Sequence, residues 1–343
     1  MFKSLKISNF GIFSHLDWQQ HGQINVLIGE NDTGKTYLLK LLYVIAKSVE
    51  DYTKRQQSDQ PNWREVLAEK MFWVYQPEDS KLGELVKKGE TRLEVEAKLL
   101  NTDYRFSFGR DTTKKISETT DNIPPQTGIN TLFIPPKEIL TAFDAIAATS
   151  EQLKIFGFDD TYQDLIKALR VPVSRKKLPP KMAEILDSLE TLFNGEITRE
   201  KNKFLFKRGR EKFGMSQTAE GIKKVGILTT LIRNHTLQSG TILIIDEPEA
   251  NLHPQALMVF IKLLFDLAQA GVQIYLATHS YTVVKQLEIL ARKYQQIIPL
   301  YSLIKQETVL ANFSDLRQGM PDNPIIAASI QLYEEDVRLD LES

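Results

Sequence analysis

The chain has 343 residues, a formal net charge of −1 and no cysteine. This length suits one large α/β domain with an insertion, or two modest domains. The missing cysteines exclude disulfides, thiolate metal sites and cysteine nucleophiles. The near-zero charge gives no global basic footprint for nucleic acid. The sequence shows neither an apolar run of membrane-spanning length nor a signal-peptide pattern, so we expect a cytoplasmic protein with no membrane contact.

The N-terminal segment predicts a phosphate-binding loop between a strand and a helix. Residues 24–28 are apolar, as in a buried strand, and residues 37–45 are apolar at helical spacing. Between them, residues 29–36 fit the pattern G-x-x-x-x-G-K-[ST], whose backbone N–H groups and helix dipole bind phosphates. Lys35 is expected to reach the β- and γ-phosphates, and Thr36 to ligate Mg²⁺. The predicted nucleotide-binding residues are Gly29, Asn31, Asp32, Thr33, Gly34, Lys35 and Thr36, with the Asp32 side chain pointing outward.

The middle of the chain predicts antiparallel strands and then helices. The polar residues 54–62 predict a loop or a helix break, and residues 91–110 alternate apolar and polar positions, as in an antiparallel hairpin. Residues 130–134 predict a further strand, stopped by two prolines. Three stretches then carry apolar positions at helical spacing, so we interpret residues 138–192 as a helical insertion. The stretches are residues 139–148, 160–169 and 181–192.

A run of cations between Arg199 and Lys212 follows the insertion, with Phe204 and Phe206 among them. We interpret residues 197–207 as a hairpin. Clustered cations attract nucleic-acid phosphates, while lysines also protect a solvated hairpin edge from pairing with other strands. The second interpretation is the simpler one, and the first stays open.

Residues 241–248 predict the catalytic carboxylates. Four aliphatic residues ending in Asp-Glu-Pro are typical of a central parallel strand that is covered on both faces. Open α/β sheets bind ligands at the carboxyl ends of such strands. We therefore expect Asp246 to hold Mg²⁺, a cation that prefers oxygen ligands. Glu247 is expected to polarise the attacking water as general base. An ordinary acidic turn is the alternative, which the phosphate loop upstream disfavours.

A histidine is predicted at the same edge of the sheet. Residues 254–270 predict a helix, and residues 273–278 predict another buried strand. Such a crossover places His279 beside Asp246 and Glu247. There the imidazole could hydrogen-bond the γ-phosphate or orient the water, so His279 is a third catalytic candidate with Lys35 and Glu247. Capping of the next helix is the alternative role.

Taken together, these motifs resemble the ATPase heads of the ABC superfamily, in the branch that holds the SMC, RecF and OLD-type ATPases. Residues 2–10 resemble that branch's first strand, residues 247–254 its extended Walker B motif and D-loop, and residues 278–280 its switch histidine. The similarity is to small bacterial AAA-type ATPases whose genes accompany defence or toxin–antitoxin effectors. It implies an α/β P-loop NTPase head with a mixed or parallel sheet, an antiparallel β subdomain and a helical insertion. It also implies ATP and Mg²⁺ as cofactors, and slow hydrolysis in an ATP-sandwiched dimer.

The signature motif of this superfamily is altered here. In the family, one subunit presents a Ser- and Gly-rich turn and a helix N-terminus to the ATP held by its twin. Residues 216–224 match that stretch, but the family serine falls on Ala219. Thr218 and Ser216 are candidate substitutes for its hydroxyl. Gly221, at the start of the predicted helix, is still expected to meet a γ-phosphate.

We thus expect an N-terminal lobe, residues 1–137, the helical insertion, residues 138–192, and a C-terminal lobe, residues 193–343. The glutamine of the family's glutamine loop is absent, and Lys137 and Glu138 stand near its place. The expected function is an ATPase that forms a homodimer or higher homo-oligomer and controls a separately encoded nuclease or toxin. Two alternatives stay open. One is a RecF-like clamp that binds DNA, and the other is a non-hydrolysing scaffold that holds ATP as a structural element.

Overall fold

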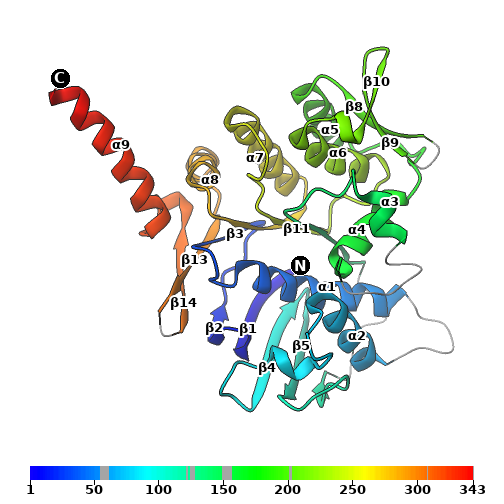
Figure 1. Cartoon of the computed structure of the whole chain (residues 1–343), viewed down its shortest axis with the longest axis vertical. Coiled ribbons are helices and arrows are strands. Elements are labelled where there is room, and N and C mark those ends of the chain that lie inside the picture. Colours follow the sequence, from blue (N-terminus) through cyan, green and yellow to red (C-terminus); the bar gives the residue numbers. More distant parts are fainter. Residues whose placement is uncertain are drawn as a thin grey trace.

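A mixed sheet runs through the centre of the molecule (Figure 1). The computed structural model describes residues 1–54, 62–120, 123, 128–148, 157–200, 203–306 and 308–342. Within this part of the chain the central sheet has the order β14-β13-β3-β12-β11-β7, and only the edge pair β13–β14 is antiparallel. Its strands are β3 (Ile24–Gly29), β7 (Asn130–Ile134), β11 (Thr241–Asp246), β12 (Gln273–Thr278), β13 (Pro299–Lys305) and β14 (Val309–Asp315). The strands predicted within residues 24–28, 130–134, 241–248 and 273–278 are confirmed, and so is the α/β class.

The strands β3, β11 and β12 are buried at every position, because both faces of the central sheet are covered. Successive side chains of a strand point to opposite faces. Leu27 accordingly packs into the first of two hydrophobic cores, and Val26 and Ile28 pack into the second. These continuous apolar runs are what a central parallel sheet requires.

The first core joins the central sheet to an antiparallel sheet of order β2-β1-β4-β5-β6 (Figure 1). The helix α1, which follows β3, contributes to the same core. The predicted hairpin within residues 91–110 is confirmed, because β4 and β5 pair antiparallel from Leu99 opposite Thr102 to Arg92 opposite Gly109. The elements of this part are β1 (Phe2–Phe10), β2 (Phe13–Trp18), α1 (Lys35–Lys54), α2 (Trp63–Tyr75), the 3₁₀ turn η1 (Leu82–Leu85), β4 (Arg92–Leu99), β5 (Thr102–Gly109) and β6 (Glu118–Thr119).

The second core lies on the other face of the sheet, where α5, α6, α7 and α8 pack (Figure 1). Their bounds are α5 (Pro180–Leu192), α6 (Glu220–Arg233), α7 (Pro254–Gln269) and α8 (Tyr281–Tyr294). The predicted helix at residues 254–270 is confirmed. It ends one residue early, and the following Gly271 has a φ of +94°, which a glycine adopts without strain.

Residues 138–192, interpreted above as an insertion, contain α3 (Phe143–Ala148), α4 (Asp160–Arg170) and α5. The helix expected from residue 139 begins only at Phe143. The carboxylate of Glu138 accepts the backbone N–H groups of Leu140 and Thr141, which holds a turn before the helix. Most of the predicted polar break, residues 55–61, lies outside the described residues.

The cation-rich hairpin is larger than predicted, because a third strand extends it. The strands β8 (Glu196–Glu200), β9 (Lys203–Arg208) and β10 (Glu211–Gly214) form an antiparallel sheet, followed by the turn η3 (Met215–Gln217). Two of its cations pair within this sheet. The Lys207 Nζ lies 3.3 Å from Glu196 Oε1, and the Lys212 Nζ lies 2.7 Å from Glu200 Oε1. These pairs favour the interpretation as a solvated edge.

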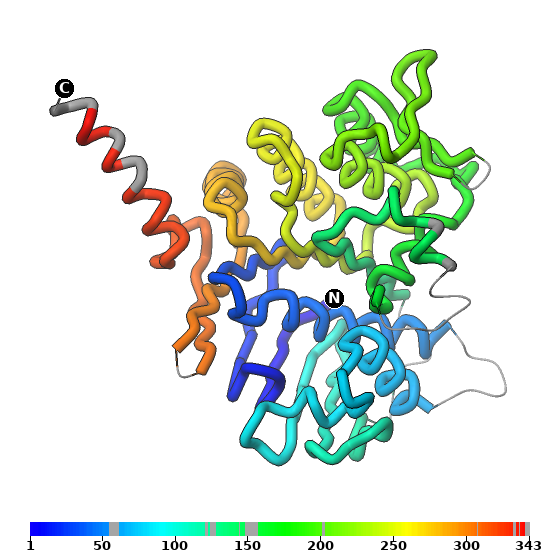
Figure 2. The backbone as a smooth tube through the Cα atoms, in the orientation of Figure 1, coloured from blue at the N-terminus to red at the C-terminus, as the bar shows by residue number. Residues whose placement is uncertain are grey.

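The chain after α8 adds an edge to the sheet and a long terminal helix. The strands β13 and β14 are followed by the turn η4 (Leu316–Gln318) and α9 (Pro324–Glu342). The helix α9 extends away from the rest of the described chain (Figure 2). None of the helices in the described ranges is both long and apolar enough to cross a membrane.

Candidate nucleotide-binding and catalytic site

The predicted phosphate loop connects β3 to α1, which begins at Lys35. Gly34 has a φ of +83°, and a Cβ at this position would lie 2.8 Å from the Phe13 ring. Only glycine therefore fits both the backbone conformation and the space. The first intrahelical hydrogen bond runs from the Leu38 N–H to the Gly34 carbonyl at 2.9 Å. The N–H groups of the first helical turn have no acceptor within the helix, which makes this helix start a place where an anion can bind.

Lys35 is buried beneath the loop. Its Nζ donates to the carbonyl oxygens of Gly29 at 2.7 Å and Glu30 at 2.8 Å. Burial lowers the pKa of Lys35, while the carboxylates of Asp246 and Glu247 act in the opposite direction. The ammonium thus lies between the phosphate loop and the acids at the end of β11.

Thr36 and Asp246 are 210 positions apart in the sequence, and their side chains are in contact. The Thr36 hydroxyl donates to Asp246 Oδ2 at 2.7 Å. Asp246 is 1% exposed, and its Oδ1 has no hydrogen-bond partner among the described residues. Burial raises the pKa of Asp246, against the Thr36 hydrogen bond, which lowers it. A hydroxyl beside a buried carboxylate with one unpaired oxygen fits the oxygen ligands that Mg²⁺ prefers.

The two other predicted catalytic residues lie next to each other at the same edge. The His279 Nδ1 is 3.6 Å from Glu247 Oε1, and both side chains are partly open to solvent. Glu247 has a φ of +50°, and its backbone N–H donates to the Ala277 carbonyl on the neighbouring strand at 2.9 Å. The structure thus brings together the ends of β3, β11 and β12, with Lys35, Thr36, Asp246, Glu247 and His279 around them.

Glu249 belongs to this cluster, although it was not predicted. Its Oε1 accepts the Thr278 hydroxyl at 2.8 Å and the His279 backbone N–H at 3.1 Å. The same oxygen lies 3.5 Å from His279 Nδ1. Its position two residues after Glu247 was the only signal in the sequence. Glu249 holds the end of β12 and orients His279.

The other loop residues take structural positions. Asp32 is exposed and pairs with Lys305 at the end of β13, which lowers the pKa of the Asp32 carboxyl. The side chain therefore points away from the loop, as expected. The Thr33 hydroxyl donates to the Glu30 carbonyl at 2.8 Å, and Asn31 is exposed. Gly29 is buried, and a Cβ there would lie 2.7 Å from the Leu303 carbonyl oxygen.

The signature-like segment lies beside the D-loop of the same chain. Gly221 is in the first turn of α6, where a Cβ would lie 2.9 Å from Leu252. Ala219 is the N-cap of α6 and supplies no side-chain cap. The Thr218 hydroxyl donates to the Gly214 carbonyl at 2.9 Å. The Ser216 side chain is exposed, and its hydroxyl has no partner in the described part of the chain. Of the two candidate substitutes, Ser216 has the available hydroxyl.

Glu138, which stands near the place of the glutamine loop, faces α6. Besides the N–H groups of its own turn, its carboxylate lies 3.6 Å from the Nζ of Lys223. Glu138 is thus part of the contact between the insertion and α6.

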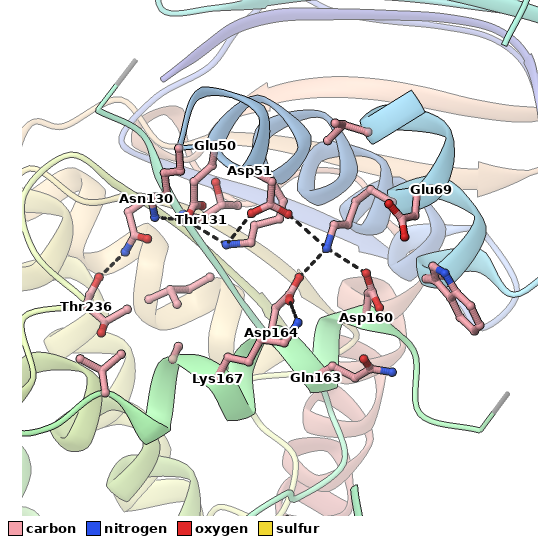
Figure 3. A pocket seen from close by; sticks show the side chains of 18 residues that line it. Glu50, Asp51, Glu69, Asn130, Thr131, Asp160, Gln163, Asp164, Lys167 and Thr236 are labelled. Atoms are coloured by element: carbon pink, nitrogen blue, oxygen red, sulfur yellow. Dashed lines mark hydrogen bonds and ion pairs between the residues drawn. The ribbon is translucent and has the colours of Figure 1, made fainter. Parts of the chain in front are cut away.

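A cavity of about 580 Å³ lies elsewhere, between α1, α2, α4 and β7 (Figure 3). Asn130 and Thr131, at the start of β7, are among the residues that line it. Because β7 and β11 are parallel, this is the end of the sheet opposite Asp246. Charged side chains line the cavity and pair with one another, among them Lys70 with Asp160 and Asp164. None of the predicted site residues lines it.

The described chain has the fold of an SMC head domain. The chain belongs to the family described as AAA domain, putative AbiEii toxin, Type IV TA system, whose model matches residues 24–285. No curated protein matches the sequence significantly.

Solved structures of SMC heads are similar to this chain. A SmcHead bound to the C-winged helix domain of ScpA has a TM-score of 0.53 at 12% identity, covering 93% of this chain and 99% of that one. The SMC head domain from Thermotoga maritima matches at a TM-score of 0.45 and 13% identity, over 91% and 98% of the two chains. A Smc head with an extended coiled coil, bound to the C-terminal domain of ScpA derived from Pyrococcus furiosus, matches at 0.49 and 10%, over 97% and 98%.

Proposed function

We propose that the chain binds Mg-ATP and hydrolyses it slowly, with Glu247 as general base. The observation that carries this proposal is the pairing of Thr36 with Asp246 at 2.7 Å, with the free Oδ1 of Asp246 beside it and Glu247 next in the chain. A phosphate loop that ends in a lysine, a metal-binding hydroxyl–carboxylate pair and an acid for the water are the parts that phosphoryl transfer requires.

Each residue has a distinct role in this reaction. The N–H groups at the start of α1 and the Lys35 ammonium bind the phosphates and stabilise the charge on the γ-phosphoryl group. Thr36 and Asp246 would hold Mg²⁺, which supplies charge neutralisation at the phosphates. Glu247 accepts a proton from the water while the water oxygen forms a bond to the γ-phosphorus. The bond between the γ-phosphorus and the β–γ bridging oxygen then breaks, and ADP leaves with that oxygen. His279, held by Glu249, orients the water or the γ-phosphate.

The proposal includes a dimer in which α6 of one subunit approaches the ATP of its twin. Gly221 and the helix N-terminus would contact the γ-phosphate, and the exposed Ser216 hydroxyl supports a replacement for the missing serine. Hydrolysis then switches the dimer state and controls a separately encoded effector, a nuclease or toxin. The family description, which names a toxin–antitoxin system, supports this setting. The division into lobes 1–137 and 193–343 and the insertion 138–192 stays part of the proposal.

The test is the solution mass of the Glu247→Gln protein with and without Mg-ATP, measured by light scattering after size exclusion. Glutamine keeps the shape of Glu247 but cannot accept the proton, so ATP should accumulate uncleaved and the mass should rise from monomer to dimer. Turnover should fall at least ~100-fold, the usual contribution of a general base. A variant that hydrolyses ATP at the parent rate would remove Glu247 as the base.

Lys35→Ala is the matched control. Without the ammonium beneath the phosphate loop, ATP binding should be lost and the mass should stay that of a monomer with or without nucleotide. An unchanged mass in Glu247→Gln that still binds ATP would refute dimerisation driven by ATP alone. ATP binding by Lys35→Ala at parent affinity would refute the assignment of the phosphate loop.

A further inference from the structure

A buried lysine at the start of α6 holds the backbone that carries Glu247. Lys224 is 7% exposed, and its Nζ donates to the carbonyl oxygens of Glu247 at 2.6 Å, Pro248 at 3.4 Å and Ala250 at 3.4 Å. Buried ammonium groups are usually paired with carboxylates. Among the described residues no carboxylate lies within ion-pair distance of Lys224, so its donors serve the backbone of this one turn.

The turn that Lys224 holds is unusual in conformation. Glu247 has a φ of +50°, in the left-handed region that residues other than glycine seldom adopt. Such a conformation persists only where the surroundings enforce it. Here the N–H of Glu247 is bonded to the Ala277 carbonyl at 2.9 Å, and its own carbonyl accepts from Lys224. The peptide groups on both sides of the Glu247 Cα are thereby fixed, and with them the direction of the Cα–Cβ bond from which the carboxylate extends.

The same turn contacts α6 at a second point. Gly221 packs against Asn251 and Leu252, which follow Ala250 in the chain. A Cβ added to Gly221 would lie 3.3 Å from the Asn251 carbonyl oxygen and 2.9 Å from the Leu252 side chain. Lys224 comes three residues after Gly221, and residues at this spacing lie on one side of a helix. The side of α6 that bears Gly221 is therefore the side that holds the turn after Glu247.

We propose that Lys224 is a positioning residue that couples the start of α6 to the Glu247 base. The inference rests on the proposed function, because that function gives Glu247 its role. In the proposed dimer, the start of α6 is the part that reaches the ATP of the twin subunit. A shift of α6 on this contact moves the Lys224 ammonium, the Glu247 peptide and hence the carboxylate. Hydrolysis in one site thus depends on how α6 is seated against the other.

The electrostatics support a functional origin for this charge. Burial lowers the pKa of Lys224 to about 8, although the carboxylates of Glu249, Glu247 and Asp246 act to raise it. Burial strongly disfavours the charged form of Lys224. Keeping this charge in the native state at neutral pH therefore reduces the stability of that state. If the Lys224 side chain only filled space, an apolar side chain would serve equally well at this position. The carbonyl oxygens of Glu247, Pro248 and Ala250 instead require a long side chain that donates hydrogen bonds.

The test compares Lys224→Met, Lys224→Arg and the control Lys223→Met. Lys223 is equally buried on the same helix, but its Nζ bonds Thr141 Oγ1 at 2.8 Å and Glu220 Oε1 at 2.6 Å, away from the turn. Lys224→Met should lower kcat about 10- to 100-fold with the KM for ATP unchanged, as expected when a catalytic group is displaced by about 1 Å. Lys224→Arg should recover part of the loss. A Lys223→Met protein with the same kcat loss would refute a specific role for Lys224.

A second comparison separates coupling from general damage. If Lys224 acts through Glu247, adding Lys224→Met to Glu247→Gln should not lower the residual rate further, because the two effects share one pathway. Fully additive losses would overturn the proposal.

Amide hydrogen exchange supplies a readout that does not need turnover. The amides of residues 247–252 should exchange faster in Lys224→Met and stay protected in Lys223→Met, since only Lys224 holds this turn. Unchanged protection in Lys224→Met would refute the coupling. If the parent protein binds ATP but does not hydrolyse it, and exchange still rises in Lys224→Met alone, the proposed function fails while the coupling of α6 to the turn stands.

Discussion

At the scale of single residues, His21 links the antiparallel sheet to the central sheet as a neutral imidazole. The Trp18 carbonyl can only accept, so His21 Nε2 donates to it at 3.0 Å, and Nδ1 accepts the Tyr275 hydroxyl at 2.8 Å. The ring stacks on Trp18 with centroids 4.8 Å apart. Burial lowers the pKa of His21 to about 4, against the Trp18 hydrogen bond, which raises it.

This arrangement predicts a loss of stability in mild acid. Between pH 6.5 and pH 4 the unfolded chain binds a proton at His21 and the native chain does not, so stability falls as the pH falls. The free energy of unfolding should drop by about 2 kcal/mol between pH 7 and pH 5 on account of this group. Urea titrations at the two pH values measure it. His21→Gln should remove that part of the pH dependence, and His15→Gln, an exposed position on β2, should keep it. A parent and a His21→Gln protein with equal pH dependence would contradict the assignment.

At the scale of elements, a buried ammonium on α2 pairs with carboxylates of both α4 and α1. The Lys70 Nζ of α2 lies 2.8 Å from Asp160 and 2.8 Å from Asp164 of α4, and 3.4 Å from Asp51 of α1 (Figure 3). Burial acts to raise the pKa of Asp164, but the charges of Lys70, Lys167 and Lys47 together hold it well below its usual value. Tyr43 of α1 also donates to Asp164 at 2.7 Å.

Removal of this ammonium should destabilise the protein strongly. Lys70→Met leaves buried carboxylates uncompensated and should lower the free energy of unfolding by about 3–5 kcal/mol in urea titrations. Lys167→Met is the control, because Lys167 also pairs with Asp164, at 3.0 Å, but is 63% exposed. Its loss should stay within about 1 kcal/mol. Equal losses in the two variants would show that the cluster does not depend on burial.

Whole elements were predictable where one local pattern determined them. The strand Asn130–Ile134 and the helix Pro254–Gln269 were predicted to within a residue, because their apolar periodicity matches the faces that the fold buries. The carboxylates Asp246 and Glu247 and the histidine His279 were predicted because each ends such a strand. The helix α2 was not, since its pattern mixes charge with apolar residues, and the strands β13 and β14 were not predicted either.

The residues that were missed have roles set by tertiary contacts. Lys224 and Lys70 read in sequence as ordinary helix lysines, and only the carbonyl and carboxylate groups that meet them in space distinguish them from surface charges. Glu249 is distinguished by Thr278, 29 positions away. Likewise, the choice between Thr218 and Ser216 depends on the Gly214 carbonyl, which occupies one of the two hydroxyls. The spacing of residues along the chain does not indicate any of these contacts.

At the scale of the whole molecule, the central sheet interleaves segments that lie far apart in sequence. The strands β3 and β7 come from residues 1–137, but β12 and β11, from residues 193–343, lie between them in the sheet. Neither segment can complete this sheet alone. The Lys70 cluster adds a buried connection from residues 138–192 to the first segment. We therefore expect the chain to unfold in one cooperative transition, although chains of this size often show intermediates.

Two probes test this expectation without labels. The three tryptophans, Trp18, Trp63 and Trp73, all lie within residues 1–137, so their fluorescence reports that segment alone. Far-ultraviolet circular dichroism reports helices along the whole chain. In urea, the two signals should share one midpoint, and Mg-ATP should raise both midpoints equally, since a ligand that binds only the native state stabilises everything that unfolds with it. Separate midpoints, or a shift of the fluorescence midpoint alone, would show that the three segments fold as independent lobes and that nucleotide binding is felt only in the first.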